Sequence, residues 1–152
     1  MLIVSDNKFN DLNLSFEIKK VSLISQTLQD KFKKELSQID SGIINYYFQS
    51  NNNNSINYVL FANGYEIGYS SLNQENSYWN LYEIYISEEF RELGLGTKLF
   101  QFILKECNKN NKAIRTYTLP SDRKAKNFYE SNRITARVLI MEEKRANSRY
   151  RP

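Results

Sequence analysis

The order of strand and helix signals predicts a mixed α/β domain, with antiparallel hairpins first and a strand–helix–strand crossover later. Asn63-Gly64 is a two-residue hairpin turn signal between runs rich in β-branched and aromatic residues. An amphipathic helix that opens at Gly94 separates two further strand-like runs. The chain has 152 residues, which fits one domain with a single core.

The first half of the chain is predicted to form strands around one helix. Alternating apolar and polar residues predict a strand over Leu12–Ile18. A helix is expected over Val21–Ile39, because its apolar residues recur every three or four positions. Strands are expected over Ile43–Gln49 and Ile56–Ala62, and Tyr65–Leu72 should pair back after the turn.

The second half is predicted to hold the crossover. A strand over Tyr78–Ile86 and a turn over Ser87–Phe90 lead to a helix from Gly94 to about Asn108. That helix should bury one apolar stripe, made of Leu99, Ile103 and Cys107.

A strand over Ala113–Leu119 and a short helix are expected to follow. Pro120-Ser121-Asp122 starts that helix: Ser121 can cap it, and Asp122 suits the positive end of its dipole. A final strand is expected over Arg137–Met141, before a polar and basic end.

Composition excludes several kinds of chemistry. The chain has no histidine, so a His-based triad, a His proton shuttle and a typical zinc site are ruled out, and we expect no metal. The lone Cys107 excludes an internal disulfide, and its mid-helix apolar position favours a core role over a nucleophile. The net charge of +4 favours anionic partners. With no signal peptide and no membrane-spanning run visible, we expect a cytoplasmic protein and no membrane partner.

The segment from Arg91 to Thr97 predicts a pyrophosphate-binding loop. Gly94 and Gly96 let the backbone turn tightly and approach a ligand, and the following helix offers unpaired N–H groups and a positive dipole end. Arg91 adds a fork of positive charge. A P-loop would need Lys before the hydroxyl residue, but here Lys98 follows Thr97, and the third glycine of a dinucleotide fingerprint is also missing.

A second motif, Asn127-Phe128-Tyr129-Glu130, falls on the short helix after the next strand. Together with R-x-x-G-x-G after a strand, it makes Leu81–Lys144 resemble the GNAT N-acetyltransferase superfamily. The resemblance implies a central mixed, mostly antiparallel sheet with one splayed strand pair and flanking helices. Residues 1–144 would form this single domain, with a basic tail over 145–152.

The resemblance also implies acetyl-CoA as co-substrate. The splayed strand would bind the pantetheine arm through backbone groups of Ile84, Tyr85 and Ile86, and the N–H near Ile86 would polarise the thioester carbonyl. The pyrophosphate would be held by Arg91 and by loop amides. Those amides belong to Glu92, Leu93, Gly94, Leu95, Gly96 and Thr97. Asn127 matches a position that contacts the pantetheine arm.

The catalytic residues that the resemblance implies are a general acid and a base. Tyr129 matches the family's general acid, which protonates the leaving thiolate; the alternative for Tyr129 is a core aromatic. The base is left open. Asn80 stands where many relatives have an acid, and Glu83, the nearest carboxylate, falls on the opposite strand face from Asn80 by alternation. Glu83 could instead be a solvated strand residue, and Glu66 is a further candidate.

Two departures from the family pattern bear on the site. Glu92 and Leu93 stand where relatives often have a small or basic residue, and a carboxylate there repels pyrophosphate unless it points outward. Arg133 stands where relatives have a glycine that closes the short helix. Because a left-handed cap costs a non-glycine residue on the order of 1–2 kcal/mol, a different cap is expected.

The function predicted is transfer of an acetyl group to a primary amine by direct attack. The alternative is a non-catalytic acyl-CoA-binding or sensing module of the same fold, motivated by Asn80. A basic nucleic-acid-binding domain is a third possibility, but Lys and Arg are scattered and no such motif is present, so no nucleic acid is expected. The acceptor amine, a small molecule or a protein, is not readable, and a homodimer stays open.

Overall fold

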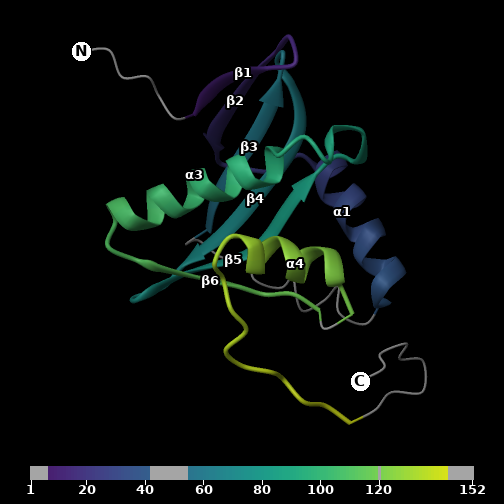
Figure 1. Ribbon diagram of the computed structural model, residues 1–152, viewed down its shortest axis with the longest axis vertical. Coiled ribbons are helices and arrows are strands. Elements are labelled where there is room, and N and C mark those ends of the chain that lie inside the picture. Colours follow the sequence, from purple (N-terminus) through teal and green to yellow (C-terminus); the bar gives the residue numbers. More distant parts are fainter. Residues whose placement is uncertain (1–6, 42–54, 120, 144–152) are drawn as a thin grey trace.

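The computed structural model describes residues 7–41, 55–119 and 121–143, which form one six-stranded sheet with helices on both faces (Figure 1). The strands lie in sequence order, from β1 at one edge to β6 at the other. Neighbours pair antiparallel except β6, which is parallel to β5. The strands are β1 (Lys8–Asp11), β2 (Leu14–Val21), β3 (Ser55–Ala62), β4 (Tyr65–Gln74), β5 (Tyr78–Ile86) and β6 (Ala113–Thr116). The helices are α1 (Gln26–Ile39), the 3₁₀ turn η2 (Glu88–Phe90), α3 (Leu95–Lys109) and α4 (Arg123–Ser131). The predicted mixed α/β class is confirmed.

The N-terminal boundaries differ from the prediction. The strand predicted from Leu12 begins at Leu14, because Leu12 and Asn13 have positive φ and form the turn of a hairpin with β1. Helix α1 begins at Gln26 instead of Val21. Val21 still pairs with β3, and the Ser25 hydroxyl caps the helix by accepting from an N–H of its first turn. The strand predicted over Ile43–Gln49 lies outside the described residues.

The central hairpin was predicted correctly. Asn63 and Gly64 both have positive φ, at 47° and 85°, as a type I′ turn requires. The β4 strand then passes very close to β5. A Cβ on Gly68 would lie 2.7 Å from the carbonyl oxygen of Tyr85, so only glycine fits there.

The crossover also follows the prediction, with a shorter last strand. Helix α3 buries the expected stripe of Leu99, Ile103 and Cys107. Burial raises the pKa of the Cys107 thiol to about 11, which suits a core residue. The strand predicted over Ala113–Leu119 ends at Thr116.

The short helix α4 corrects two predictions about its ends. Asp122, not Ser121, is the N-cap: its carboxylate accepts from the N–H of Ala125 at 3.1 Å. At the other end Arg133 does adopt the left-handed conformation, with φ 67°. The N–H of Ile134 reaches the carbonyl of Tyr129 at 3.0 Å, which is the six-to-one hydrogen bond of a Schellman cap.

The final strand predicted over Arg137–Met141 is absent, and this segment has no regular secondary structure. Val138, Leu139, Ile140 and Met141 are 66–84% exposed. Their β-branched and apolar character favours a strand, but a strand needs a partner, and within the described residues β6 pairs only with β5.

The sheet packs a different cluster on each face. The larger core lies between the sheet and helices α3 and α4, and includes Leu72, Leu81 and Phe100. The second lies against α1 and includes Leu28 and Tyr69. Figure 1 shows α3 and α4 over one face of the sheet. No helix in the described part of the chain is long and apolar enough to cross a membrane.

Candidate active site

The neighbouring strands β5 and β6 separate part-way along their length. Their parallel pairing runs from Tyr78 opposite Ala113 to Leu81 opposite Thr116 and then stops. Among the residues that the structure describes, the rest of β5, from Glu83 to Ile86, pairs only with β4. The backbone edge of β5 that includes Ile84, Tyr85 and Ile86 is therefore open on the β6 side, as a splayed pair requires.

The glycine loop, Arg91–Thr97, ends in a helix terminus that is suited to an anion. Gly94 is the N-cap of α3 in the left-handed conformation, with φ 77°, and it offers no side-chain cap. The first N–H groups of α3 therefore point out of the helix with the positive end of its dipole. Glu92, also left-handed with φ 65°, is exposed, as is Leu93.

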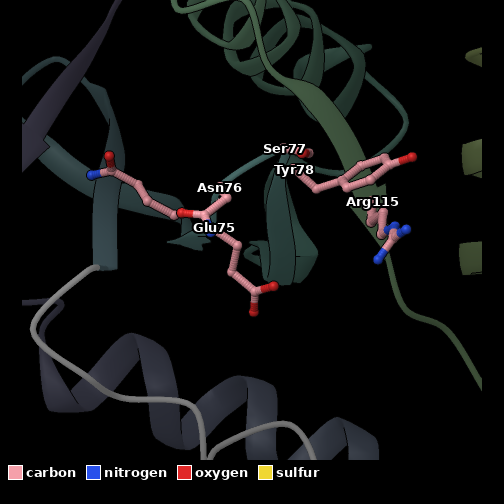
Figure 2. Close-up of a pocket in the computed structure, with 6 residues that line it drawn as sticks. Glu75, Asn76, Ser77, Tyr78 and Arg115 are labelled. Atoms are coloured by element: carbon pink, nitrogen blue, oxygen red, sulfur yellow. The ribbon is translucent and has the colours of Figure 1, made fainter.

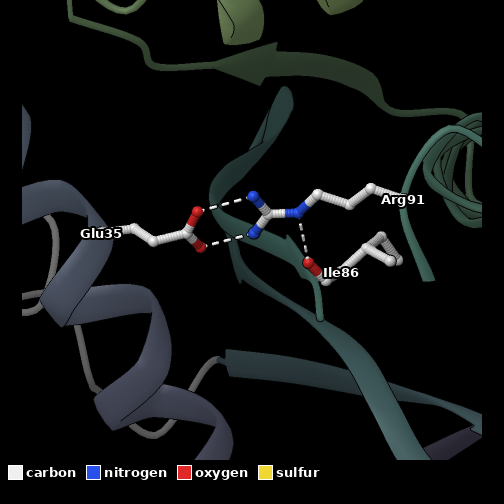
Figure 3. A network of polar contacts seen from close by, with 3 residues as sticks. All are labelled: Glu35, Ile86 and Arg91. Atoms are coloured by element: carbon white, nitrogen blue, oxygen red, sulfur yellow. Dashed lines mark hydrogen bonds and ion pairs between the residues drawn. The ribbon is translucent and has the colours of Figure 1, made fainter. Parts of the chain in front are cut away.

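The Arg91 side chain is held by helix α1 and by the end of β5 (Figure 3). Its Nη1 and Nη2 donate to the two carboxylate oxygens of Glu35 at 2.6 and 2.5 Å, and its Nε donates to the carbonyl of Ile86 at 2.8 Å. The guanidinium also lies over the ring of Tyr85, 5.3 Å from its centre. The Glu35 hydrogen bonds raise the pKa of Arg91 further. The fork of charge expected beside the loop is thus engaged with a carboxylate.

Helix α4 brings its aromatic pair to the first turn of α3. A Cβ on Gly96 would meet Phe128 Cε1 at 3.3 Å and Ile86 Cγ1 at 3.9 Å, so the loop glycine, α4 and the end of β5 converge. Tyr129 is 6% exposed, with its ring edge-on to Phe128 and Phe100. Asn127, by contrast, is exposed on α4.

A β-bulge in β5 changes which side chains share a face. Ser71 lies opposite Glu83 but the next β4 residue, Leu72, lies opposite Leu81, so Tyr82 is an extra residue. The alternation is reset there. Asn80 and Glu83, expected on opposite faces, therefore both face α1.

Contacts on the α1 side of the sheet support this placement. The Asn80 amide oxygen accepts from the hydroxyl of Tyr117, which packs near Leu36 of α1. Glu83 accepts from Tyr69, whose ring meets Phe32 of α1. The expectation from simple alternation was wrong because the extra residue reverses it.

Glu83 is a buried carboxylate, only 3% exposed, and not the solvated residue that was its alternative. The hydroxyl of Tyr69 donates to its Oε1 at 2.7 Å, and Gln29 and Lys33 of α1 also favour its charged form. Desolvation outweighs these contacts and raises the pKa of Glu83 to about 6. At neutral pH this acid is mostly ionised yet holds a proton more readily than an exposed glutamate.

The two candidate catalytic side chains, Tyr129 and Glu83, thus lie on opposite faces of the sheet. Tyr129 belongs to the core beneath α3 and α4, and Glu83 faces α1. Glu83 itself lies on the part of β5 that has no β6 partner. On the same side of the sheet the extra residue Tyr82 stacks on Tyr117, with ring centres 4.7 Å apart.

Sequence reasoning missed Glu35 and Tyr69. Glu35 is 56 positions before Arg91, and no local pattern links them. Tyr69 could have been found, since it lies two residues from Ser71, which pairs with Glu83 across a hairpin.

A separate, open hollow of about 500 Å³ lies where β4 turns into β5 (Figure 2). Residues from Gln74 to Tyr78 line it with Arg115, whose guanidinium lies 3.6 Å from the centre of the Tyr78 ring. This hollow is at the start of β5, whereas the glycine loop follows its end, so the two are different sites.

The family is decided by a sequence profile described as Acetyltransferase (GNAT) domain, which matches residues 24–132. The chain belongs to this family. The matched range contains the glycine loop, the bulged strand β5 and helix α4 of this GNAT domain. No curated protein shows significant sequence similarity to the chain.

Solved structures of GNAT acetyltransferases share the fold. The ribosomal-protein-alanine N-acetyltransferase from Brucella melitensis matches with TM-score 0.66 and 12% identity, over 86% of this chain and 98% of that one. AAC(6')-Iy, in complex with the bisubstrate analogue CoA-S-monomethyl-acetylneamine, matches with TM-score 0.57 and 15% identity, over 86% and 99%. Glucosamine-6-phosphate N-acetyltransferase from Arabidopsis thaliana matches with TM-score 0.56 and 17% identity, over 85% and 97%.

Proposed function

We propose that this GNAT domain is an N-acetyltransferase that moves the acetyl group of acetyl-CoA to a primary amine. The observation that carries the proposal is that the N-terminus of α3, where Gly94 provides no side-chain cap, lies beside the end of β5 that has no β6 partner. A helix terminus of this kind binds pyrophosphate, and open backbone N–H and C=O groups bind amides. The complex of AAC(6')-Iy with a CoA conjugate agrees with this use of the fold.

In this proposal the cofactor lies along β5. The N–H groups from Glu92 to Thr97 hold the pyrophosphate, and the backbone of Ile84, Tyr85 and Ile86 holds the pantetheine arm. Asn127, exposed on α4, contacts the same arm from the other side. The exposed position of Glu92 removes part of the repulsion that its charge would cause.

The chemical step uses one group from each face of the sheet. Glu83 takes a proton from the ammonium form of the acceptor, directly or through water, which frees the lone pair. The amine nitrogen attacks the thioester carbonyl, whose oxygen is stabilised by the N–H near Ile86. The C–N bond forms, the C–S bond breaks, and Tyr129 protonates the departing thiolate. The attacking nitrogen loses its second proton to water, Glu83 releases its proton to solvent, and Tyr129 regains one from solvent, so one net proton is released for each ammonium acetylated.

The acceptor would reach Glu83 from the α1 side, past the Tyr82–Tyr117 stack. Aromatic faces and a carboxylate both favour a cationic amine. The names of the structural relatives point to different amines: an aminoglycoside derivative, glucosamine 6-phosphate and a protein alanine. They therefore indicate an amine acceptor without selecting one.

Release of free thiol from acetyl-CoA tests the proposal. We expect release to depend on an added amine drawn from a panel of aminoglycosides, amino sugars, polyamines, lysine peptides and peptides with free N-termini. Mass spectrometry should find one added acetyl group per thiol released. Cofactor binding without amine-dependent release from any panel member would favour the non-catalytic binding module.

A further inference from the structure

Glu35 is the only carboxylate seen to pair with Arg91 in the described ranges 7–41, 55–119 and 121–143, and the pair is well formed. Three guanidinium nitrogens are engaged, two with Glu35 and one with the Ile86 carbonyl. A bidentate Arg–carboxylate contact fixes both distance and orientation. The side chains are 34% and 38% exposed, so the pair lies at the surface of the site and not in its core.

The Glu35–Arg91 ion pair joins two segments that are 56 positions apart in the sequence. Glu35 lies on α1, the helix that also carries Gln29 and Lys33, which interact with Glu83. Arg91 lies at the start of the glycine loop. The Ile86 carbonyl that its Nε binds belongs to the β5 segment with no β6 partner.

The ion pair with Glu35 also limits the electrostatic attraction between Arg91 and a phosphate. A guanidinium already paired with a carboxylate carries little net field toward a nearby phosphate. The N–H groups at the N-terminus of α3 remain able to bind the phosphate. Without the pair, this end of β5 would keep its backbone pairing with β4 and its side-chain packing, but the Ile86 carbonyl would lose its contact with Arg91.

We propose that Glu35 is a positioning residue, which acts through Arg91 to fix the end of β5 that has no β6 partner and to tie α1 to it. This inference rests on the proposed function, because it assigns the pair a role in the cofactor site. Arg91 then serves as a brace on the Ile86 carbonyl and not as the charge that binds pyrophosphate.

Acetyl-CoA titrations by calorimetry test the proposal with four variants. Glu35→Gln and Arg91→Gln each remove one side of the pair, and the double variant removes both. Asp30→Asn makes the same change of charge at an exposed position of α1 and is the matched control. Each protein is first checked for its free energy of unfolding, and titrations are run at low and high salt.

We expect both single variants to weaken binding by a similar factor, about five- to tenfold, or about 1–1.4 kcal/mol. The double variant should weaken it no further, because the two residues act as one unit. The salt dependence should stay as in the wild type, and Asp30→Asn should bind as the wild type does. If Arg91→Gln does not fold, the direction of the change in acetyl-CoA affinity in Glu35→Gln decides whether Arg91 braces β5 or binds the pyrophosphate.

Two results would overturn the proposal. Tighter binding in Glu35→Gln, with a flattened salt dependence in Arg91→Gln, would mean that the guanidinium binds the pyrophosphate and that Glu35 competes for it. Unchanged affinity in both folded variants would mean that the pair has no role in the site. Wild-type protein that binds no acetyl-CoA would instead reject the proposed function.

Discussion

The hydroxyl of Tyr69 donates a 2.7 Å hydrogen bond to the carboxylate of Glu83, and both side chains are buried on the α1 side of the sheet. The contact exists because of the extra residue Tyr82, which turns Glu83 to that face. A buried, oriented carboxylate with a raised pKa is a suitable base for an amine.

The pH dependence of turnover should report Glu83. Because its pKa is about 6, the ionised base is lost below that pH, and kcat/KM should fall there. Glu83→Gln should lower kcat/KM by about 10²–10⁴-fold and remove this limb. The profile is measured with two acceptors whose amine pKa values differ. The limb due to ionisation of the acceptor should move with the amine pKa, and the limb due to Glu83 should not. Glu66→Gln, at an exposed residue of β4, is the control and should keep the wild-type profile.

The same residue predicts a dependence of stability on pH. The pKa of Glu83 is raised from 4.5 to about 6 on folding, so the folded state binds this proton more tightly. Its contribution to stability is full below 4.5 and is lost as the pH rises through about 6. In urea unfolding, the free energy of unfolding of Glu83→Gln relative to that of the wild type should rise by on the order of 2 kcal/mol from acid to neutral pH. A constant difference between the two proteins would mean that the pKa is not raised.

The parts of the fold that could be predicted depend on local sequence. Asn63-Gly64 can form only a few turns, and the run Tyr78–Ile86 carries its own strand signal, so both were placed correctly. The bulge at Tyr82 could not be predicted, because it depends on how β4 and β5 register over their whole length. Arg137–Met141 has strand-like residues but no pairing partner in the described structure, and no local signal gives that.

The features of the site could likewise be predicted only where they depend on local sequence. The glycine loop could be predicted because backbone approach and helix-terminal N–H groups follow from Gly94 and Gly96 in sequence. The Arg91–Glu35 pair could not, because it joins elements whose separation in space no local pattern encodes.

Tyr129→Phe should slow the chemical step. The substitution removes one oxygen and keeps the ring against Phe100, so packing should change little. We expect kcat to fall by about 10²–10⁴-fold with acetyl-CoA affinity near wild type, as for a group that acts only in the transition state. Tyr65→Phe, at an exposed tyrosine, is the control. Wild-type turnover in Tyr129→Phe, with chemistry limiting, would point to water as the proton source.

Gly96→Asp should abolish cofactor binding in a folded protein. A Cβ at this position lies 3.3 Å from a ring atom of Phe128, which can shift to make room, but the carboxylate would add a negative charge beside the loop N–H groups that are proposed to hold the pyrophosphate. Gly64→Asn, in open space at the β3–β4 turn, is the control, because asparagine tolerates positive φ. Acetyl-CoA affinity retained in folded Gly96→Asp would mean that the loop is only a turn.

A thermal melt of the wild-type protein with and without acetyl-CoA tests the central claim most directly, because it needs no acceptor. A ligand that binds only the folded state stabilises it, by about 2.7 kcal/mol at a concentration 100 times its Kd. We predict a rise in Tm that saturates with acetyl-CoA and is absent in Gly96→Asp. No shift at about millimolar acetyl-CoA, far above any useful Kd, would contradict the assignment of the Arg91–Thr97 loop and the open end of β5 as an acetyl-CoA site.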